Sequence, residues 1–88
     1  MRIKNIHYSS KFIRSLKQIP KEIASVLDGR VEILKNDCFD HRLKTHKLKG
    51  KFKNIWSFSV TYSYRIVFEF VGENEVLFIE IGNHDIYR

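Results

Sequence analysis

Residues with the side chains needed for phosphodiester chemistry occur in the C-terminal half of the sequence. Arg65 lies within an otherwise apolar stretch, His46 lies in a lysine-rich segment, and His84 and Tyr87 lie close to the last residue. RNA can be cleaved when a base removes the 2′-hydroxyl proton, cations hold the phosphate oxygens, and an acid protonates the leaving oxygen. Arginine binds phosphate bidentately, and histidine titrates near neutral pH. These residues are therefore candidates for RNA cleavage.

The net positive charge of the chain is concentrated in one segment. The chain has 16 Lys and Arg against 10 Asp and Glu, a formal net charge of +6. Residues 41–53 contain no acid, and their six cations equal the whole net charge: Arg42, Lys44, Lys47, Lys49, Lys51 and Lys53. The segment is predicted to bind RNA, because each phosphate that is neutralised releases counterions. A solvated lysine-rich loop is the alternative interpretation.

The stretch from residue 61 to residue 70 is predicted to be the β-strand that carries Arg65. Apolar side chains recur at every second position and define a core face with Tyr64, Ile66, Phe68 and Phe70. Side chains alternate between the two faces of a strand. Arg65 is therefore expected on the face opposite the core.

Two helices are predicted before this strand. Ser9 or Ser10 is suited to cap the first helix. Its apolar stripe is predicted to contain Phe12, Ile13, Leu16 and Ile19. Pro20 ends this helix and can begin the next, whose apolar stripe runs over residues 23–34. Arg30 lies inside that stripe, so its side chain either extends past its neighbours to solvent or meets a partner.

The remaining segments are predicted to be strands and one long loop. Residues 3–8 indicate a first strand, and residues 36–53 have no clean period and are expected to form a loop. Strands are then predicted at about 54–60, 64–71 and 76–81, joined by links short enough for antiparallel hairpins. The order β-α-α-β-β-β predicts an α+β fold, with an N-terminal strand and a helical hairpin packed on a mainly antiparallel sheet.

Antiparallel pairing is expected to bring further polar groups to Arg65. The end of the strand at 76–81 should lie beside the start of the Arg65 strand, so that His84 and Tyr87 come near Arg65. A purely structural alternative is an ion pair in which Glu80 faces Arg65 across the strands.

Composition restricts the class of protein. Residues 1–88 are expected to form a single domain with one core, since 43% of the residues are hydrophobic. No apolar run reaches the roughly 20 residues that a membrane span needs, and no secretion signal is evident at the first residues. Cys38 is the only cysteine, which excludes an internal disulfide and suggests a reducing cytoplasm. No closely spaced His or Cys pair is present, so we expect neither a metal site nor a cofactor.

Three short motifs resemble those of a known toxin family. They are residues 46–50 (HKLKG), 64–68 (YRIVF) and 81–87 (IGNHDIY). Their order and spacing, over nearly the whole chain, resemble the RelE/ParE superfamily of toxins from type II toxin–antitoxin systems, in particular the RelE/YafQ-like mRNA interferases. The resemblance implies a ribosome-dependent mRNA endonuclease that acts in the 30S A site and inhibits translation. It also implies a cognate antitoxin that holds the toxin inactive, with operator DNA bound only by the toxin–antitoxin complex.

The resemblance also implies roles for individual residues. Arg65 matches the arginine that stabilises phosphate charge, and His84 matches a position that is histidine or arginine and is a candidate acid. His46 matches the active-site histidine of the YafQ-like branch. Tyr87 is near a C-terminal aromatic that orients the substrate base, although it follows His84 at a shorter spacing than in several relatives.

The sequence departs from the family pattern on the strand before Arg65. Trp56 and Phe58 stand where the type member has two lysines, one of them the proposed base, and Ser59 aligns with a histidine of the YafQ-like branch. The candidates for the base are therefore His46, Lys49 and Lys51.

Two alternative functions do not involve RNA cleavage. A ParE-like or degenerate toxin would bind a protein target such as DNA gyrase, with the basic loop as contact surface. A non-catalytic nucleic-acid-binding module would use the basic segment alone. The nuclease is favoured because a binding module does not need titratable groups gathered around one arginine.

Overall fold

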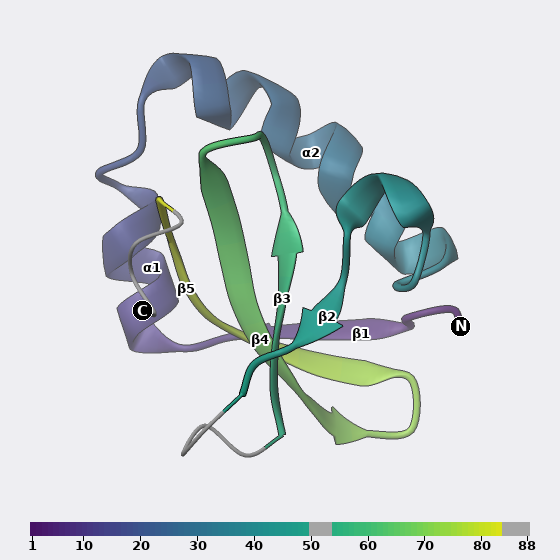
Figure 1. Cartoon of the computed structure of the whole chain (residues 1–88). Helices are drawn as coiled ribbons and strands as arrows, with labels where there is room; N and C mark the ends of the chain where they lie inside the picture. The colour runs from purple at the N-terminus through teal and green to yellow at the C-terminus, as the bar shows by residue number, and fades with distance from the viewer. Residues whose placement is uncertain (50–53, 84–88) are drawn as a thin grey trace.

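The computed structural model describes residues 1–49 and 54–83 of the chain. Within these ranges the secondary-structure elements are β1 (Asn5–Tyr8), α1 (Ser10–Leu16), α2 (Lys21–Asn36), the 3₁₀ helix η1 (His41–Leu43), β2 (His46–Lys47), β3 (Ile55–Ser59), β4 (Tyr64–Gly72) and β5 (Glu75–Asn83), as Figure 1 shows. The predicted α+β fold is confirmed. The expectation of a loop over residues 36–53 is wrong in part, because η1 and the two-residue strand β2 lie within it.

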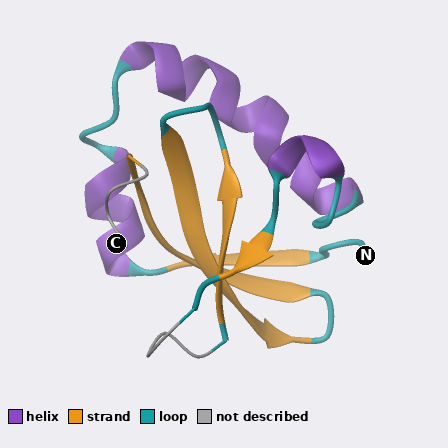
Figure 2. Cartoon of the chain, viewed as in Figure 1, coloured by secondary structure: helices purple, strands orange, loops and turns teal. Residues whose placement is uncertain are grey.

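The described strands form one sheet in the order β1-β5-β4-β3-β2 (Figure 2). β4 lies between β3 and β5, its neighbours in sequence, and both pairings are antiparallel as predicted. β1 pairs with β5 in parallel, and the chain between them supplies the long connection that a parallel pair needs. β2 covers the edge of β3, and its register pairs His46 with Ser57.

The start of α1 follows the predicted capping chemistry. Ser9 is the N-cap with an extended backbone, and its hydroxyl oxygen accepts a hydrogen bond from the backbone N–H of Phe12. α1 ends at Leu16, earlier than predicted, and Pro20 is the N-cap of α2. Ile13 is exposed, contrary to the prediction, because it follows Phe12 by about 100° around the helix and so leaves the buried stripe. No helix in the described residues is both long and apolar enough to cross a bilayer.

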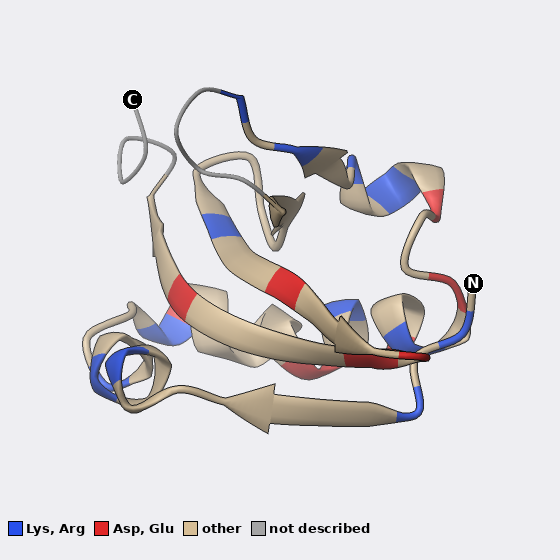
Figure 3. Ribbon diagram, turned by 90° about the horizontal axis from the view of Figure 1, so that it is seen from below, with Lys and Arg blue, Asp and Glu red and all other residues tan. Residues whose placement is uncertain are grey.

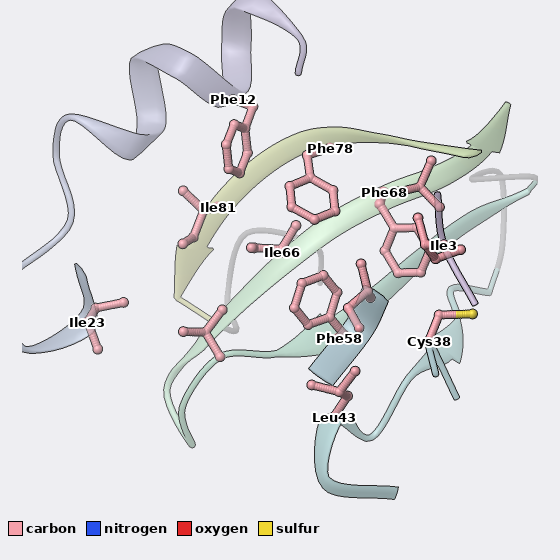
Figure 4. Close-up of a cluster of buried hydrophobic side chains, with 13 residues drawn as sticks. Ile3, Phe12, Ile23, Cys38, Leu43, Phe58, Ile66, Phe68, Phe78 and Ile81 are labelled. Carbon is pink, nitrogen blue, oxygen red and sulfur yellow. The ribbon is translucent and has the colours of Figure 1, made fainter. Parts of the chain in front are cut away.

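Both helices pack against one face of the sheet, where the hydrophobic core lies (Figure 4). Phe58, Phe68 and Phe78 are fully buried, and the ring of Phe58 lies 5.8 Å from that of Phe68 and 5.7 Å from that of Phe78. The helices contribute Phe12, Ile23 and Leu34, and η1 contributes Leu43. Ile66 and Phe68 of β4 belong to this core, so the alternation of the strand directs Arg65 to the opposite face.

Candidate functional site

Arg65 occupies a position on β4 that is flanked by small residues. Its backbone pairs with Ser59 on β3 and with Gly82 on β5. Its Nε is shielded from solvent and has no hydrogen-bond partner in the part of the chain that the structure describes. A buried donor without a partner is uncommon in folded proteins, and guanidinium nitrogens only donate. Arg65 is therefore positioned to donate to a bound acceptor.

The predicted alternative, an ion pair between Arg65 and Glu80, is wrong. Gly82 lies opposite Arg65, and Glu80 lies opposite Val67, two residues further along β4. The carboxylate of Glu80 instead forms an ion pair with Lys11 of α1, at 3.2 Å.

A pocket of about 270 Å³ opens beside Arg65, at the end of the sheet where β3 turns into β4. Its lining consists of cationic and hydroxyl side chains: Arg30, Arg42, Lys44, Ser59, Thr61, Tyr62 and Arg65. No described acidic residue lines it. Figure 3 shows basic residues along η1 and β2 and a basic band on β4. Four cations with hydroxyl donors and no carboxylate suit an anion of phosphate size.

The wall of the pocket contributed by η1 is fixed by Asp40. Its carboxylate accepts hydrogen bonds from the backbone N–H of Arg42 and from two guanidinium nitrogens of Arg42, at 2.9 to 3.0 Å. The hydrogen bonds from Arg42 hold the pKa of the Asp40 carboxyl well below its usual range. Lys44 is the C-cap of η1, and its backbone is left-handed with φ of 51°. This short turn therefore places two of the cations in the pocket.

Arg30 is a pocket residue that no motif in the sequence indicates. Its Nη1 donates a hydrogen bond to the backbone carbonyl oxygen of Arg42, at 3.2 Å. The second of the two predicted possibilities is therefore correct, because the side chain meets a partner. In the sequence, the one indication of this role is that an arginine lies within an apolar helical stripe. Through Arg30, α2 adds a cation to a pocket otherwise formed by η1, β3, β4 and the turn between these strands.

His46 is exposed on β2, and a contact of its ring indicates which ring nitrogen carries the proton. Its Nδ1 lies 3.0 Å from the backbone carbonyl oxygen of Lys44. A carbonyl oxygen only accepts, so Nδ1 carries the proton, and in the neutral ring Nε2 is left as an acceptor. A base for the chemistry outlined above needs such a nitrogen.

His46 and Arg65 lie on the same face of the sheet without lining the same pocket. His46 pairs with Ser57, Ser57 pairs with Val67, and Arg65 lies two residues from Val67 on β4. Two strand spacings and two residues along a strand separate their Cα atoms by about 12 Å. His46 and Arg65 therefore flank the same stretch of this face.

Of the other predicted site residues, Lys47 and Lys49 are described by the structure and four are not. Lys47 pairs with Trp56, so alternation directs it away from the face that carries His46 and Arg65. Lys49 is exposed beyond the end of β2. The remaining candidates lie outside the described residues: Lys51, Lys53, His84 and Tyr87. The described chain ends with Asn83 paired to Tyr64, so β5 runs beside the start of β4 as predicted.

The register shows which residues of β3 face the site. Trp56 and Phe58 lie on the core face, where Phe58 is fully buried. The positions on the Arg65 face are Ser57 and Ser59, which pair with Val67 and Arg65. β3 therefore supplies hydroxyl groups to this face and no amine or imidazole base.

Comparison with known proteins identifies the fold. No family model matches the sequence, and no curated protein matches it. Similar solved structures include a chain of the E. coli DinJ–YafQ toxin–antitoxin complex, with 19% identity over 96% of this chain and 94% of that chain and a TM-score of 0.73. The RelB–RelE antitoxin–toxin complex of Methanococcus jannaschii gives 22% identity, 88% coverage of both chains and a TM-score of 0.69. The YoeB/ParE toxin of Agrobacterium tumefaciens gives 16% identity, coverage of 92% and 99%, and a TM-score of 0.75.

Proposed function

The chain has the fold of the RelE-superfamily toxins, and from this premise we propose that it is the toxin of a type II toxin–antitoxin system, a ribosome-dependent endoribonuclease that cleaves mRNA. The observation that carries the proposal is Arg65, whose shielded Nε has no partner in the described residues and which lines a pocket without described acids. His46, with Nε2 as acceptor, lies on the same face of the sheet.

The proposed reaction uses the side chains of this face. Nε2 of His46 takes the proton of a 2′-hydroxyl, and the oxygen attacks the adjacent phosphorus. Arg65 donates hydrogen bonds to the non-bridging oxygens, where negative charge develops. The P–O5′ bond breaks as an acid, for which we propose His84, protonates the leaving oxygen. The products are a 2′,3′-cyclic phosphate and a 5′-hydroxyl end, and Tyr87 is proposed to orient the base.

A cognate antitoxin follows from the same proposal. Two of the similar structures are complexes of a toxin with an antitoxin, DinJ with YafQ and RelB with RelE. For this chain we propose a small antitoxin with an acidic segment that meets the cations of residues 41–53, because opposite charges favour association. Operator DNA would be bound only by the complex, and the toxin would act in the cytoplasm.

Primer extension on translating ribosomes tests the cleavage. Purified protein added to ribosomes with bound mRNA is expected to produce new 5′ ends, which accept phosphate from polynucleotide kinase without prior phosphatase treatment because they are hydroxyls. Preincubation with the antitoxin should abolish them. Absence of new ends on every message would contradict the proposal. Accumulation of cleaved DNA–gyrase complexes instead would identify a gyrase-directed toxin.

A further inference from the structure

Tyr62 is the most exposed large side chain among the described hydrophobic residues, at 91%. It belongs to the turn between β3 and β4, and this turn is held by three hydrogen bonds. The backbone N–H groups of Val60 and Thr61 both donate to the carbonyl oxygen of Tyr64, and the N–H of Tyr64 donates to Oγ1 of Thr61. The aromatic ring therefore projects from an ordered turn, and it makes no ring contact with another described residue. Nothing in the packing of the described residues explains its presence.

The position of Tyr62 relates it to the cationic pocket. Tyr62 is one of the lining residues, and Arg30, Arg42 and Lys44 lie in the same lining. The pocket volume of about 270 Å³ is slightly below that of a typical site for a drug-sized ligand, roughly 300 to 1,000 Å³. A phosphate and its ribose match this space and this charge. The base of the same nucleotide would then lie outside, where the exposed ring is located.

We propose that this pocket and Tyr62 form a binding site for one nucleotide of single-stranded RNA next to the cleaved bond. The phosphate lies among Arg30, Arg42 and Lys44, and the base stacks on the ring of Tyr62. This inference rests on the proposed function and adds a substrate contact to it. Stacking of bases on aromatic side chains beside a cationic groove is a general mode of single-strand recognition. Tyrosine loses little conformational entropy when it makes such a contact.

Binding of a non-cleavable RNA tests the stacking contact. The probe is a fluorescein-labelled, 2′-O-methylated oligonucleotide, whose affinity is measured by fluorescence anisotropy. Tyr62→Ala is expected to weaken binding about 10-fold, since one stacked base contributes roughly 5- to 100-fold. Tyr62→Phe keeps the ring and should stay within about twofold of the wild type. Ser63→Ala, a change at the next exposed residue of the same turn, is the matched control and should have no effect.

An abasic scan identifies the partner of the ring. Removing one base of the probe at a time should weaken wild-type binding at one position, and at that position Tyr62→Ala should have no further effect. If Arg30 contacts a phosphate, Arg30→Gln should reduce the slope of log affinity against log salt concentration by about 0.7. Lys21 is an exposed cation of α2 outside the pocket, so Lys21→Gln should leave this slope unchanged.

The outcomes separate this inference from the proposed function. If cleavage occurs and Tyr62→Ala leaves both RNA affinity and cleavage unchanged, the nucleotide site is wrong while the nuclease stands. If Tyr62→Ala impairs only binding of the antitoxin, the ring belongs to a protein interface and the inference is overturned. If the scan shows the expected coupling but no message is cleaved, the nucleotide site is supported and the nuclease is rejected.

Discussion

Two charged regions of this molecule differ in how their polar groups are paired. In the first, which we call the N-terminal corner, Met1, Arg2, Asp37, Cys38 and Asn74 meet. The ammonium group of Met1 forms an ion pair with Asp37 at 2.8 Å, and the Asn74 amide donates to the carbonyl oxygen of Arg2 at 2.6 Å. The backbone N–H of Cys38 donates to the carbonyl oxygen of Met1. The second region is the cationic pocket.

The cationic pocket has the opposite character. Of its four cations, Arg42 pairs with the carboxylate of Asp40, Arg30 donates to a backbone carbonyl, and Arg65 and Lys44 have no carboxylate partner among the described residues. Paired groups at the corner fasten the first residues to the sheet and to the end of α2, which stabilises the fold. Cations that outnumber the carboxylates around them repel one another and are retained where an anion is to be bound. The comparison therefore predicts that changes at the corner affect stability, and changes in the pocket affect activity.

The largest expected effect is that of Arg65→Ala on cleavage. Removing a preorganised donor to a developing oxyanion typically lowers the rate by about 100- to 1,000-fold. The free energy of unfolding should change by less than about 1 kcal/mol, because no ion pair with a described residue is lost. Single-turnover cleavage and urea unfolding measure the two quantities. A large loss of stability with retained cleavage would show that Arg65 stabilises the fold and does not serve cleavage. The contrast between the pocket and the corner would then be wrong.

Asn74→Ala should lower the stability and leave cleavage unchanged. Asn74 has a left-handed backbone with φ of 61°, in the turn between β4 and β5, and its amide holds Arg2. Alanine there adds strain of about 1 kcal/mol and loses a hydrogen bond of about 1 kcal/mol, so urea unfolding should show a loss of about 2 kcal/mol. Asn74→Gly relieves the strain and should lose about half as much. Cleavage at a temperature where both variants are folded should equal that of the wild type, and reduced cleavage there would contradict the comparison.

The sequence predicts the regular part of the fold well. β3, β4 and β5 lie within two residues of their predicted bounds, because alternation, short links and aromatic residues all favour strands there. β2 has only two residues, too few to show a period, and it forms because the edge of β3 offers it backbone partners. Ser9 was identified as a possible cap because its capping interaction is local.

The site is less predictable than the fold. Residue type and motif indicate Arg65 and His46, and the structure places them on one face. Arg30 and Tyr62 reach the pocket through tertiary packing of α2 against η1 and through the turn between β3 and β4, and neither has a motif. The pairing of Arg65 with Gly82 rather than with Glu80 depends on the register between β4 and β5, which alternation alone does not give.

The smallest expected effect is a pH dependence of stability at the corner, separate from the one that the lowered pKa of the Asp40 carboxyl contributes at the wall of the pocket. The hydrogen bond from the ammonium group lowers the pKa of Asp37, so its contribution is present above the unfolded value of about 3.9 and is lost as pH falls through the folded pKa. The same bond to Asp37 raises the pKa of the Met1 ammonium. That contribution is present below the unfolded value of about 8 and is lost as pH rises through the folded pKa.

Asp37→Asn tests this window, since the amide oxygen can still accept the N–H of Phe39 that Asp37 binds in the wild type. The difference in melting temperature between wild type and variant should be greatest between about pH 4 and pH 8 and should shrink on both sides. Because both groups are exposed, the difference should be small and should decrease further in high salt. Arg65→Ala should follow the wild-type profile throughout, since no described carboxylate pairs with Arg65. A profile for Arg65→Ala that departed from it below pH 5 would reveal a carboxylate partner and would remove the distinction between the two regions.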